Sequence, residues 1–171
     1  MSAIALQASG IRKSYARNGR SLEVVDVATF TATFASGAVG TFSASRVSHN
    51  LPNSLGFEVF ASKGAATYDL ARASEFGFSD NSAAATTIGY RQVLVGPVHP
   101  YITRGLAMDF PSVGVGQNDL FVFETRAFLE QIAGMDGLPR VPDLAHGWRN
   151  LTLLDAVVKS TLSGGAAVVI A

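Results

Sequence analysis

The side chains best suited to proton transfer near neutral pH in this 171-residue sequence are its three histidines. His49, His99 and His146 lie far apart, and none has carboxylates at the spacing of a metal site. The chain has no cysteine, which excludes thiol catalysis, disulfides and cysteine-based zinc sites. Ser36 and Ser62 fall in predicted turns without an adjacent base, so neither is a candidate nucleophile. The sequence predicts no metal site and no catalytic residue.

Polar side chains with binding chemistry gather in a connection after a predicted strand. Arg46 could hydrogen-bond a substrate hydroxyl or carboxylate, although we favour the alternative that it pairs across a hairpin with Asp26. His49 could act as a general acid, and Asn53 follows it in the same connection. For this histidine the favoured alternative is a solvated loop residue.

The elements that must position these residues begin with β-hairpins. Residues 27–34 alternate between an aromatic face and a threonine-rich face, which is the period of a strand. The triplet Ala35-Ser36-Gly37 predicts a hairpin loop with Gly37 in the left-handed region. In that register the cross-strand partners are Phe30 with Phe42 and Asp26 with Arg46. A second hairpin is predicted around Ser62-Lys63-Gly64.

The pattern changes from strands to helices along the chain. We expect a first strand and a loop in residues 1–20, β-hairpins in 21–95, a long loop in 96–117, two helices in 118–164 and a final strand in 165–171. The predicted apolar stripe of the first helix is Phe121, Val122, Thr125, Phe128, Leu129 and Ile132, and that of the second is Leu144, Trp148, Leu151, Leu154, Val158 and Leu162.

Strands first and helices last indicate a single α+β domain, with an open, mainly antiparallel sheet of about six strands and helices packed on one face. Two helical stripes cannot cover both faces of such a sheet, so one broad face should stay open. Open apolar faces usually mark oligomer or domain contacts. We therefore expect a homo-oligomer formed through the open sheet face.

Composition narrows the partners. The 13 basic and 13 acidic residues cancel, which leaves no excess charge for nucleic acid. No apolar run reaches the roughly 18 residues of a membrane span, and the start lacks a signal-peptide pattern, so we expect no membrane partner and a cytoplasmic location. Charged residues make up only 15% of the chain, against about 25% in typical domains. Either an apolar surface covered by a partner or a biased genome composition would explain this.

Four stretches form a recognisable set. They are Val25-Asp-Val-Ala-Thr-Phe30, Ser36-Gly-Ala-Val-Gly-Thr-Phe-Ser-Ala-Ser-Arg46, Phe57-Glu-Val-Phe-Ala-Ser-Lys-Gly64 and His146-Gly-Trp-Arg-Asn-Leu-Thr-Leu-Leu-Asp-Ala-Val157. In order and spacing, the set resembles the C-terminal domain of the Gfo/Idh/MocA oxidoreductases. Each motif is weak alone, but together they cover nearly the whole chain from Val25.

The resemblance implies a glyceraldehyde-3-phosphate-dehydrogenase-like C-terminal fold, which in the family follows a Rossmann domain. Such enzymes move a hydride between NAD(P) and usually a sugar, polyol or related hydroxy compound. The sheet domain supplies part of the pocket, so a small sugar-like ligand is implied here. His99 and Tyr101 lie in a His-Pro-Tyr stretch similar to the family's and become substrate-binding candidates beside Arg46, His49 and Asn53. A turn-stabilising role is an equal alternative for His99 and Tyr101.

The family's cofactor machinery is missing from this sequence. The nearest glycine string, Gly114-Val-Gly-Gln-Asn-Asp119, has Asp119 in place of the third glycine and follows a proline-containing loop instead of a strand. The family's Glu-Lys-Pro motif, with its catalytic lysine, is also absent. We therefore expect no cofactor to bind this chain alone, and NAD(P) is implied only for a full-length enzyme or one partnered with a separate Rossmann-domain chain.

Two functions stay open. The first is the substrate-binding and oligomerisation domain of a Gfo/Idh/MocA-type sugar or polyol oxidoreductase, not competent for hydride transfer alone. The alternative is a non-catalytic sugar-binding or assembly module, either a natural subunit or a truncated gene product. The sequence does not decide whether the chain is an enzyme.

Overall fold

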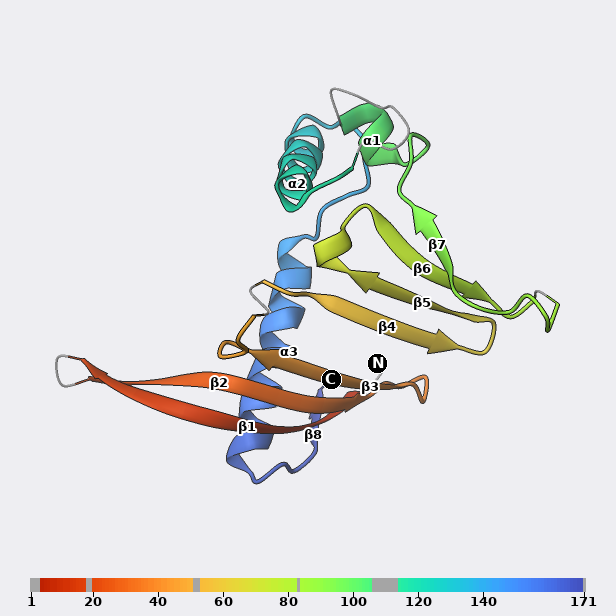
Figure 1. The fold of residues 1–171 in the computed structure, drawn as a ribbon. Coiled ribbons are helices and arrows are strands. Elements are labelled where there is room, and N and C mark those ends of the chain that lie inside the picture. The colour runs from red at the N-terminus through yellow and green to blue at the C-terminus, as the bar shows by residue number, and fades with distance from the viewer. Residues whose placement is uncertain (1–3, 18–19, 51–52, 83, 106–113, 171) are drawn as a thin grey trace. The chain divides into compact units, whose positions relative to one another are not determined.

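The computed structural model describes residues 4–17, 20–50, 53–82, 84–105 and 114–170. The chain divides into two compact units, which are described separately (Figure 1). Unit 1 consists of Met1–Pro52 and Pro142–Ala171, and unit 2 of Asn53–Val141. No described helix combines the length and apolar character of a membrane span.

Unit 1 is a four-stranded antiparallel sheet with one long helix. The strand order is β3-β2-β1-β8. The elements are β1 (Ile4–Arg17), β2 (Arg20–Thr33), β3 (Val39–Ser45), α3 (Leu144–Leu162) and β8 (Val168–Ile170). The helix contacts β1 and β8. The C-terminal strand therefore closes the sheet beside the strand with which the chain begins.

The β2–β3 hairpin has the predicted register. Phe30 lies opposite Phe42, and the two rings stack with centroids 4.7 Å apart. Gly37 has φ +83°, the left-handed conformation that glycine adopts without steric cost. The turn closes through hydrogen bonds from the N–H of Gly37 to the carbonyl of Phe34 and from the N–H of Phe34 to the carbonyl of Ala38. Loop chemistry and side-chain alternation together fix this register.

Unit 2 contains a second four-stranded antiparallel sheet, ordered β4-β5-β6-β7. Its elements are β4 (Gly56–Ala61), β5 (Gly64–Asp69), the short 3₁₀ helix η1 (Leu70–Arg72), β6 (Glu75–Asp80), β7 (Arg91–Leu94), α1 (Pro100–Gly105) and α2 (Gln117–Ile132). The cross-strand register places one set of mostly aromatic residues on a single sheet face, here called the aromatic face. Its members are Phe57, Val59, Tyr68, Phe76 and Phe78.

The β4–β5 turn differs from the prediction. Ala61 pairs with Gly64, so Ser62 and Lys63 form a two-residue loop and Gly64 is the first residue of β5. A Cβ atom on Gly64 would overlap the carbonyl oxygen of Ser79 on β6. Glycine is needed here for close approach of a neighbouring strand, not for a left-handed turn.

The helices of unit 2 build a small core of their own. Ile102, Val115 and Phe123 are buried together. Tyr101 and Leu120 pack against this cluster. Because α1 and the start of α2 supply most of these side chains, the core fixes how the two helices contact each other.

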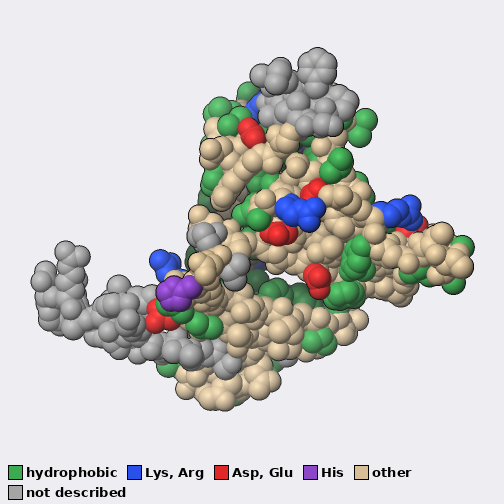
Figure 2. All heavy atoms as spheres, viewed as in Figure 1, with side chains coloured by type: hydrophobic (Ala, Val, Ile, Leu, Met, Phe, Trp, Pro, Cys, Tyr) green, Lys and Arg blue, Asp and Glu red, His purple; other side chains and the backbone are tan. Residues whose placement is uncertain are grey.

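The predicted apolar stripes of α2 and α3 lie on exposed helix faces. On α3, Trp148 is 71% exposed and Leu151 60% exposed, whereas the small residues Ala156 and Ser160 are buried. On α2, the buried residues are Phe123 and Ala127. Small side chains let a helix approach its neighbour closely, so the covered face is not the one with the largest apolar residues. Figure 2 likewise shows hydrophobic side chains at the surface.

The α+β class with antiparallel strands is confirmed, with three differences in detail. The described strands form two four-stranded sheets instead of one sheet of about six. Residues 12–17, expected in a loop, continue β1 because they pair with β2. The expected loop 96–117 contains α1, whose first residue is a proline suited to that position. Residues 106–113 of that loop lie outside the described residues.

Candidate functional site

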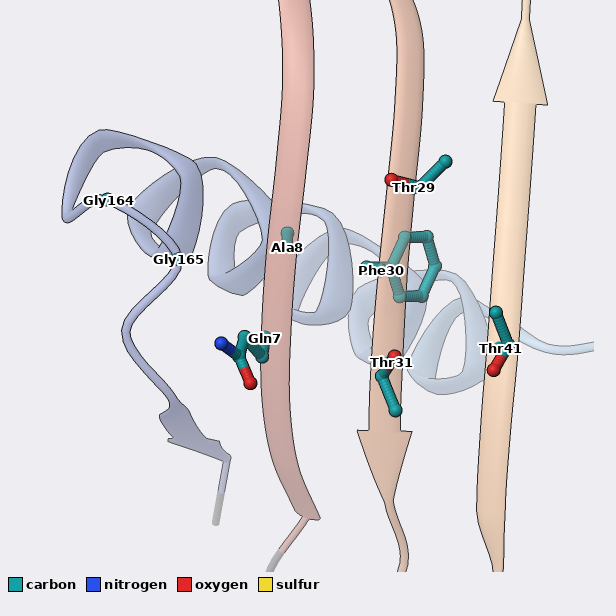
Figure 3. Close-up of a pocket in the computed structure, with 8 residues that line it drawn as sticks. All are labelled: Gln7, Ala8, Thr29, Phe30, Thr31, Thr41, Gly164 and Gly165. Atoms are coloured by element: carbon teal, nitrogen blue, oxygen red, sulfur yellow. The ribbon is translucent and has the colours of Figure 1, made fainter.

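A polar hollow of about 350 Å³ lies on the sheet of unit 1, and we call it the threonine hollow (Figure 3). Its lining residues are Gln7, Ala8, Thr29, Phe30, Thr31, Thr41, Gly164 and Gly165. The register places Gln7, Thr31 and Thr41 opposite one another across three strands. Figure 3 shows these three side chains on β1, β2 and β3, with α3 behind the strands.

The chemistry of the threonine hollow is neutral. Amide and hydroxyl groups both donate and accept hydrogen bonds, and none of the lining side chains carries a charge. Such groups match the hydroxyls of a neutral polyol. They include no carboxylate, histidine or lysine to transfer a proton. The described lining side chains of the hollow thus supply hydrogen-bond donors and acceptors and no group that titrates near neutral pH.

Ser160 on α3 hydrogen-bonds two backbone segments beside the hollow. Its side chain is fully buried on α3. The Oγ atom accepts a hydrogen bond from the backbone N–H of Ala8 (2.7 Å) and donates one to the carbonyl of Ala166 (2.8 Å). Gly164 and Gly165 end the helix with φ angles of +66° and +87°. The hydroxyl thus connects α3, β1 and the segment that leads to β8.

Two predicted site residues, Arg46 and His49, lie in unit 1 just after β3, and both are exposed. The backbone N–H of Arg46 donates to the carbonyl of Asp26 at 2.8 Å, which continues the hairpin ladder. Asp26 and Arg46 are both among the described residues, and their side chains form no ion pair with each other. The register predicted for Arg46 is correct, but the contact is made by the backbone.

The other predicted site residues, Asn53, His99 and Tyr101, lie in unit 2. Asn53 is exposed and has φ +52°, a left-handed conformation that asparagine tolerates better than most residues. Of the three, the structure brings together His99 and Tyr101, whose ring centroids are 5.7 Å apart. Within the described residues, no hydrogen bond or ring contact joins Asn53 to this pair.

Tyr101 makes structural contacts with α2 and with the segment that follows it. Its ring stacks on Phe123 with centroids 5.4 Å apart, and its hydroxyl donates to the carbonyl of Pro139 at 3.2 Å. The ring therefore joins α1, α2 and the segment after α2. His99 lies at the outer end of the stack and is exposed, so its imidazole is the part of this cluster that a ligand can reach.

The glycine string near Gly116 does not fit a dinucleotide. A helix begins within this string, at Gln117, one residue before the expected start at 118. However, the Asp119 carboxylate accepts a hydrogen bond from the backbone N–H of Gly116 at 2.8 Å. A carboxylate there occupies the donor that a phosphate would use and repels its charge. Both described sheets are antiparallel, unlike the parallel sheet of a dinucleotide-binding fold.

The described side chains form no metal site. Within ranges 4–17, 20–50, 53–82, 84–105 and 114–170, no three His, Asp or Glu residues come close enough to hold a metal ion. The candidate surfaces are therefore the threonine hollow and the exposed ring of His99.

Comparisons with known proteins identify the relatives of this chain. No family model matches it. Levoglucosan dehydrogenase from Pseudarthrobacter phenanthrenivorans is 33% identical over 127 residues, which cover 74% of this chain and 32% of that protein. The solved structure of a levoglucosan dehydrogenase in complex with NADH and L-sorbose superposes with a TM-score of 0.83 at 28% identity, over 99% of this chain and 45% of that one. The homologues of this chain are Gfo/Idh/MocA-type oxidoreductases.

A further solved structure shows a similarity of the same extent. An oxidoreductase domain protein from Kribbella flavida superposes with a TM-score of 0.78 at 27% identity, covering 95% of this chain and 42% of that one. The chain thus spans less than half the length of these relatives and corresponds to a partial, C-terminal-like segment of a Gfo/Idh/MocA-type protein.

Sequence reasoning missed the threonine hollow. Its signal was the threonine-rich face of residues 27–34, which was visible as a pattern. The contribution of Gln7 depends on the β1–β2 register, which sets residue 7 opposite residue 31. Residues 18–19, between β1 and β2, lie outside the described residues.

Proposed function

We propose that this chain is the substrate-binding and oligomerisation domain of a Gfo/Idh/MocA-type sugar or polyol oxidoreductase, and that it does not transfer hydride alone. The observation that carries the proposal is the match of 99% of this chain to 45% of a levoglucosan dehydrogenase in complex with NADH and L-sorbose. A similar segment of a sugar-binding enzyme supports a sugar-like ligand for this one.

The described polar surfaces are compatible with such a ligand. The threonine hollow offers neutral donors and acceptors, and His99 offers an exposed imidazole. Because Tyr101 uses its hydroxyl on Pro139, we assign it to positioning His99. Arg46, His49 and Asn53 stay substrate-binding candidates as exposed polar residues of the connection after β3.

NAD(P) would bind a part of the enzyme outside the described residues. The Asp119 carboxylate at the start of α2 argues against a pyrophosphate there. A separate Rossmann-domain chain, or the remainder of a longer polypeptide, would supply the cofactor and the catalytic lysine. We place the assembly in the cytoplasm, in agreement with the absence of cysteine from the sequence.

Exposed apolar surface supports the proposed assembly. On the aromatic face of unit 2, Phe57 is 53% and Phe78 42% exposed. On α3, Leu151 and Leu154 are each 60% exposed. Contiguous apolar surface of this kind is normally covered by another subunit or domain. We propose that the aromatic face, the open sheet face expected from the sequence, forms a homo-oligomer contact.

The test is ligand binding by the purified chain. NADH fluorescence titration should show no saturable binding, whereas isothermal titration with L-sorbose and levoglucosan as probes should show weak binding. A Thr31→Val/Thr41→Val variant keeps side-chain shape and removes two hydroxyls, and His99→Ala removes the imidazole. If both variants bind the sugars as the unchanged chain does, neither surface is the site. Saturable NADH binding by the chain alone would contradict the proposal.

The alternative function, a non-catalytic sugar-binding or assembly module, is favoured by one observation. The threonine hollow is formed entirely by unit 1, so it needs no second domain to exist. Mixing the chain with the Rossmann half of a relative separates the two functions. Sugar- and NAD(P)-dependent turnover in the mixture indicates an oxidoreductase domain, and sugar binding without turnover indicates a module.

A further inference from the structure

The part of unit 1 that carries the threonine hollow has no charged residue in its sequence. The strands around the hollow consist of residues 4–11 of β1, 27–33 of β2, 39–45 of β3 and the short strand β8. All four stretches, and residues 163–167 between α3 and β8, lack Asp, Glu, Lys, Arg and His. A ligand on this part of the sheet is therefore bound without an ion pair to its strands.

The hydrogen-bonding groups of the hollow form a row across three strands. Gln7 lies opposite Thr31, and Thr31 lies opposite Thr41. All three residues are exposed, and Figure 3 shows their side chains on neighbouring strands. Strands in a sheet lie about 4.7–4.9 Å apart, so the row presents an amide and two hydroxyls at that repeat. Each of these groups both donates and accepts, which lets the row pair with several hydroxyls of one ligand.

The C-terminal end of α3 borders the hollow and disfavours an anion there. Gly164 and Gly165 line the hollow directly after the helix, which ends at Leu162. A helix C-terminus carries about half an elementary charge of negative sign. The basic residue of the last turn, Lys159, is paired with Asp155 at 2.7 Å and is not among the described lining residues. A phosphate or carboxylate in the hollow would thus meet a negative dipole end without a compensating cation.

The size of the hollow limits the ligand to about one sugar unit. Its volume of about 350 Å³ lies near the lower end of the range for small-molecule pockets, about 300–1,000 Å³. The two glycines leave one side of it without side chains. A Cβ atom on Gly164 would have no neighbour within 4 Å, and one on Gly165 would lie 3.8 Å from Nε2 of Gln7. Larger residues here would therefore take up space beside the row.

We infer that the threonine hollow binds an uncharged monosaccharide or cyclic polyol and rejects phosphorylated and acidic sugars. The inference rests on the proposed function and decides between the two surfaces named there. A ligand held at His99 would be affected by protonation of the imidazole, which attracts an anion when charged. A ligand held in the hollow is bound by described side chains that do not titrate near neutral pH.

Glucose, glucuronate and glucose 6-phosphate are probes of similar shape that differ in charge. Titration of the ¹⁵N-labelled chain with glucose should shift the amide resonances of Gln7, Thr31 and Thr41. At equal ionic strength, the two anions should bind at least tenfold more weakly, because no cation offsets their charge. The glucose affinity of the unchanged chain should vary less than threefold between about pH 5.5 and pH 8, whereas binding through His99 would follow the titration of its imidazole.

Two matched variants test the row itself. Thr31→Val/Thr41→Val should weaken glucose binding about tenfold, because it removes two hydroxyls and keeps side-chain shape. Thr33→Val/Ser43→Ala removes two hydroxyls from the same strands outside the described lining and should change the affinity less than threefold. Thr41→Lys adds a cation to the row and should reverse the preference, so that glucose 6-phosphate binds more tightly than glucose. Circular dichroism verifies that every variant is folded.

The outcomes separate this inference from the proposed function. Equal affinity of the unchanged chain for glucose and glucose 6-phosphate overturns the inference, and so does unaltered glucose binding by Thr31→Val/Thr41→Val. Glucose binding that is lost in His99→Ala instead assigns the ligand to unit 2 and leaves the proposed function standing. If glucose, L-sorbose and levoglucosan all fail to bind, both are overturned. Saturable NADH binding together with the expected preference for glucose contradicts the proposed function alone.

Discussion

At the scale of single residues, the Ser160 hydroxyl takes the place of backbone hydrogen bonds between two strands. The described pairing of β8 with β1 involves residues 4–6 of β1 and stops at Leu6. Beyond Leu6, the Ser160 hydroxyl bridges the N–H of Ala8 and the carbonyl of Ala166. Both backbone groups would otherwise lack these partners. A buried unsatisfied donor or acceptor is expensive. The residue therefore joins the helix to the strand edge at the wall of the threonine hollow.

Ser160→Ala should lower the free energy of unfolding by about 2 kcal/mol or more, because it removes the acceptor of one backbone group and the donor to another. Urea denaturation followed by circular dichroism measures the change. Ser163→Ala, at the exposed end of the same helix, is the matched control and should stay within about 0.5 kcal/mol. Equal effects of the two substitutions would show that the Ser160 bridge adds nothing.

Asp80 gives a pH-dependent prediction. Its carboxylate accepts a hydrogen bond from the backbone N–H of Ser82 (2.9 Å), and this contact, the Ser82 hydroxyl and the charge of Arg91 hold the pKa of Asp80 below its ordinary value of 3.8. A lowered pKa in the folded chain stabilises the fold above pH 3.8, and that contribution is lost as pH falls through the folded-state pKa.

The Asp80→Asn variant should therefore melt at a lower temperature than the unchanged chain near neutral pH. The difference in Tm should narrow as pH falls below the ordinary carboxyl range, because both side chains are then neutral. Thermal melts across an acidic pH series measure it, with Glu124→Gln as a control at an exposed carboxylate. A difference in Tm that is constant with pH would exclude the charge of Asp80 as its cause.

At the scale of elements, hairpins were predictable and helix faces were not. The β2–β3 register follows from the Ala35-Ser36-Gly37 loop and from alternation, both of which are local. Which face of α3 is buried cannot be read from local sequence, because it depends on which side chains pack against the sheet of unit 1. Small residues around Ala156 pack on that sheet, and the larger stripe with Trp148 stays exposed. Periodicity alone identifies an apolar stripe without identifying what covers it.

Gly64 tests the packing of one such element. The Gly64→Ala variant introduces a methyl group that would overlap the Ser79 carbonyl, so β5 and β6 must move apart. We expect a loss of about 1–3 kcal/mol in unfolding free energy. Gly89→Ala is the control, since nothing lies within 4 Å of a Cβ at that position. Chemical denaturation measures the unfolding free energy of both variants. A loss only in Gly64→Ala indicates the steric overlap, whereas similar values for the two variants would mean that close packing at Gly64 is not required.

At the scale of the whole molecule, the sequence predicted the fold class and the family but only part of the candidate site. Family motifs lie on hairpins and on α3, where order and spacing are preserved. Tyr101 was counted with His99 because the two share a His-Pro-Tyr stretch similar to the family's, although its ring packs against the core cluster of unit 2. Gln7 was overlooked because its neighbours in the hollow, Thr31 and Thr41, come from strands 24 and 34 residues further along the sequence.

The fluorescence of the single tryptophan can test whether a Rossmann-domain partner docks on α3. Trp148 lies on the exposed stripe of α3 and is 71% exposed, so the purified chain should emit at the long wavelengths of a solvated indole. If the Rossmann half of a relative docks on that stripe, the emission should shift to shorter wavelength and become protected from a neutral quencher. Leu151→Glu, 60% exposed on the same stripe, should abolish the shift by placing a charge in the contact. If Leu151→Glu shows the same emission shift as the unchanged chain, α3 is not the docking face. The same conclusion follows if the unchanged chain shows no shift although the mixture turns over substrate.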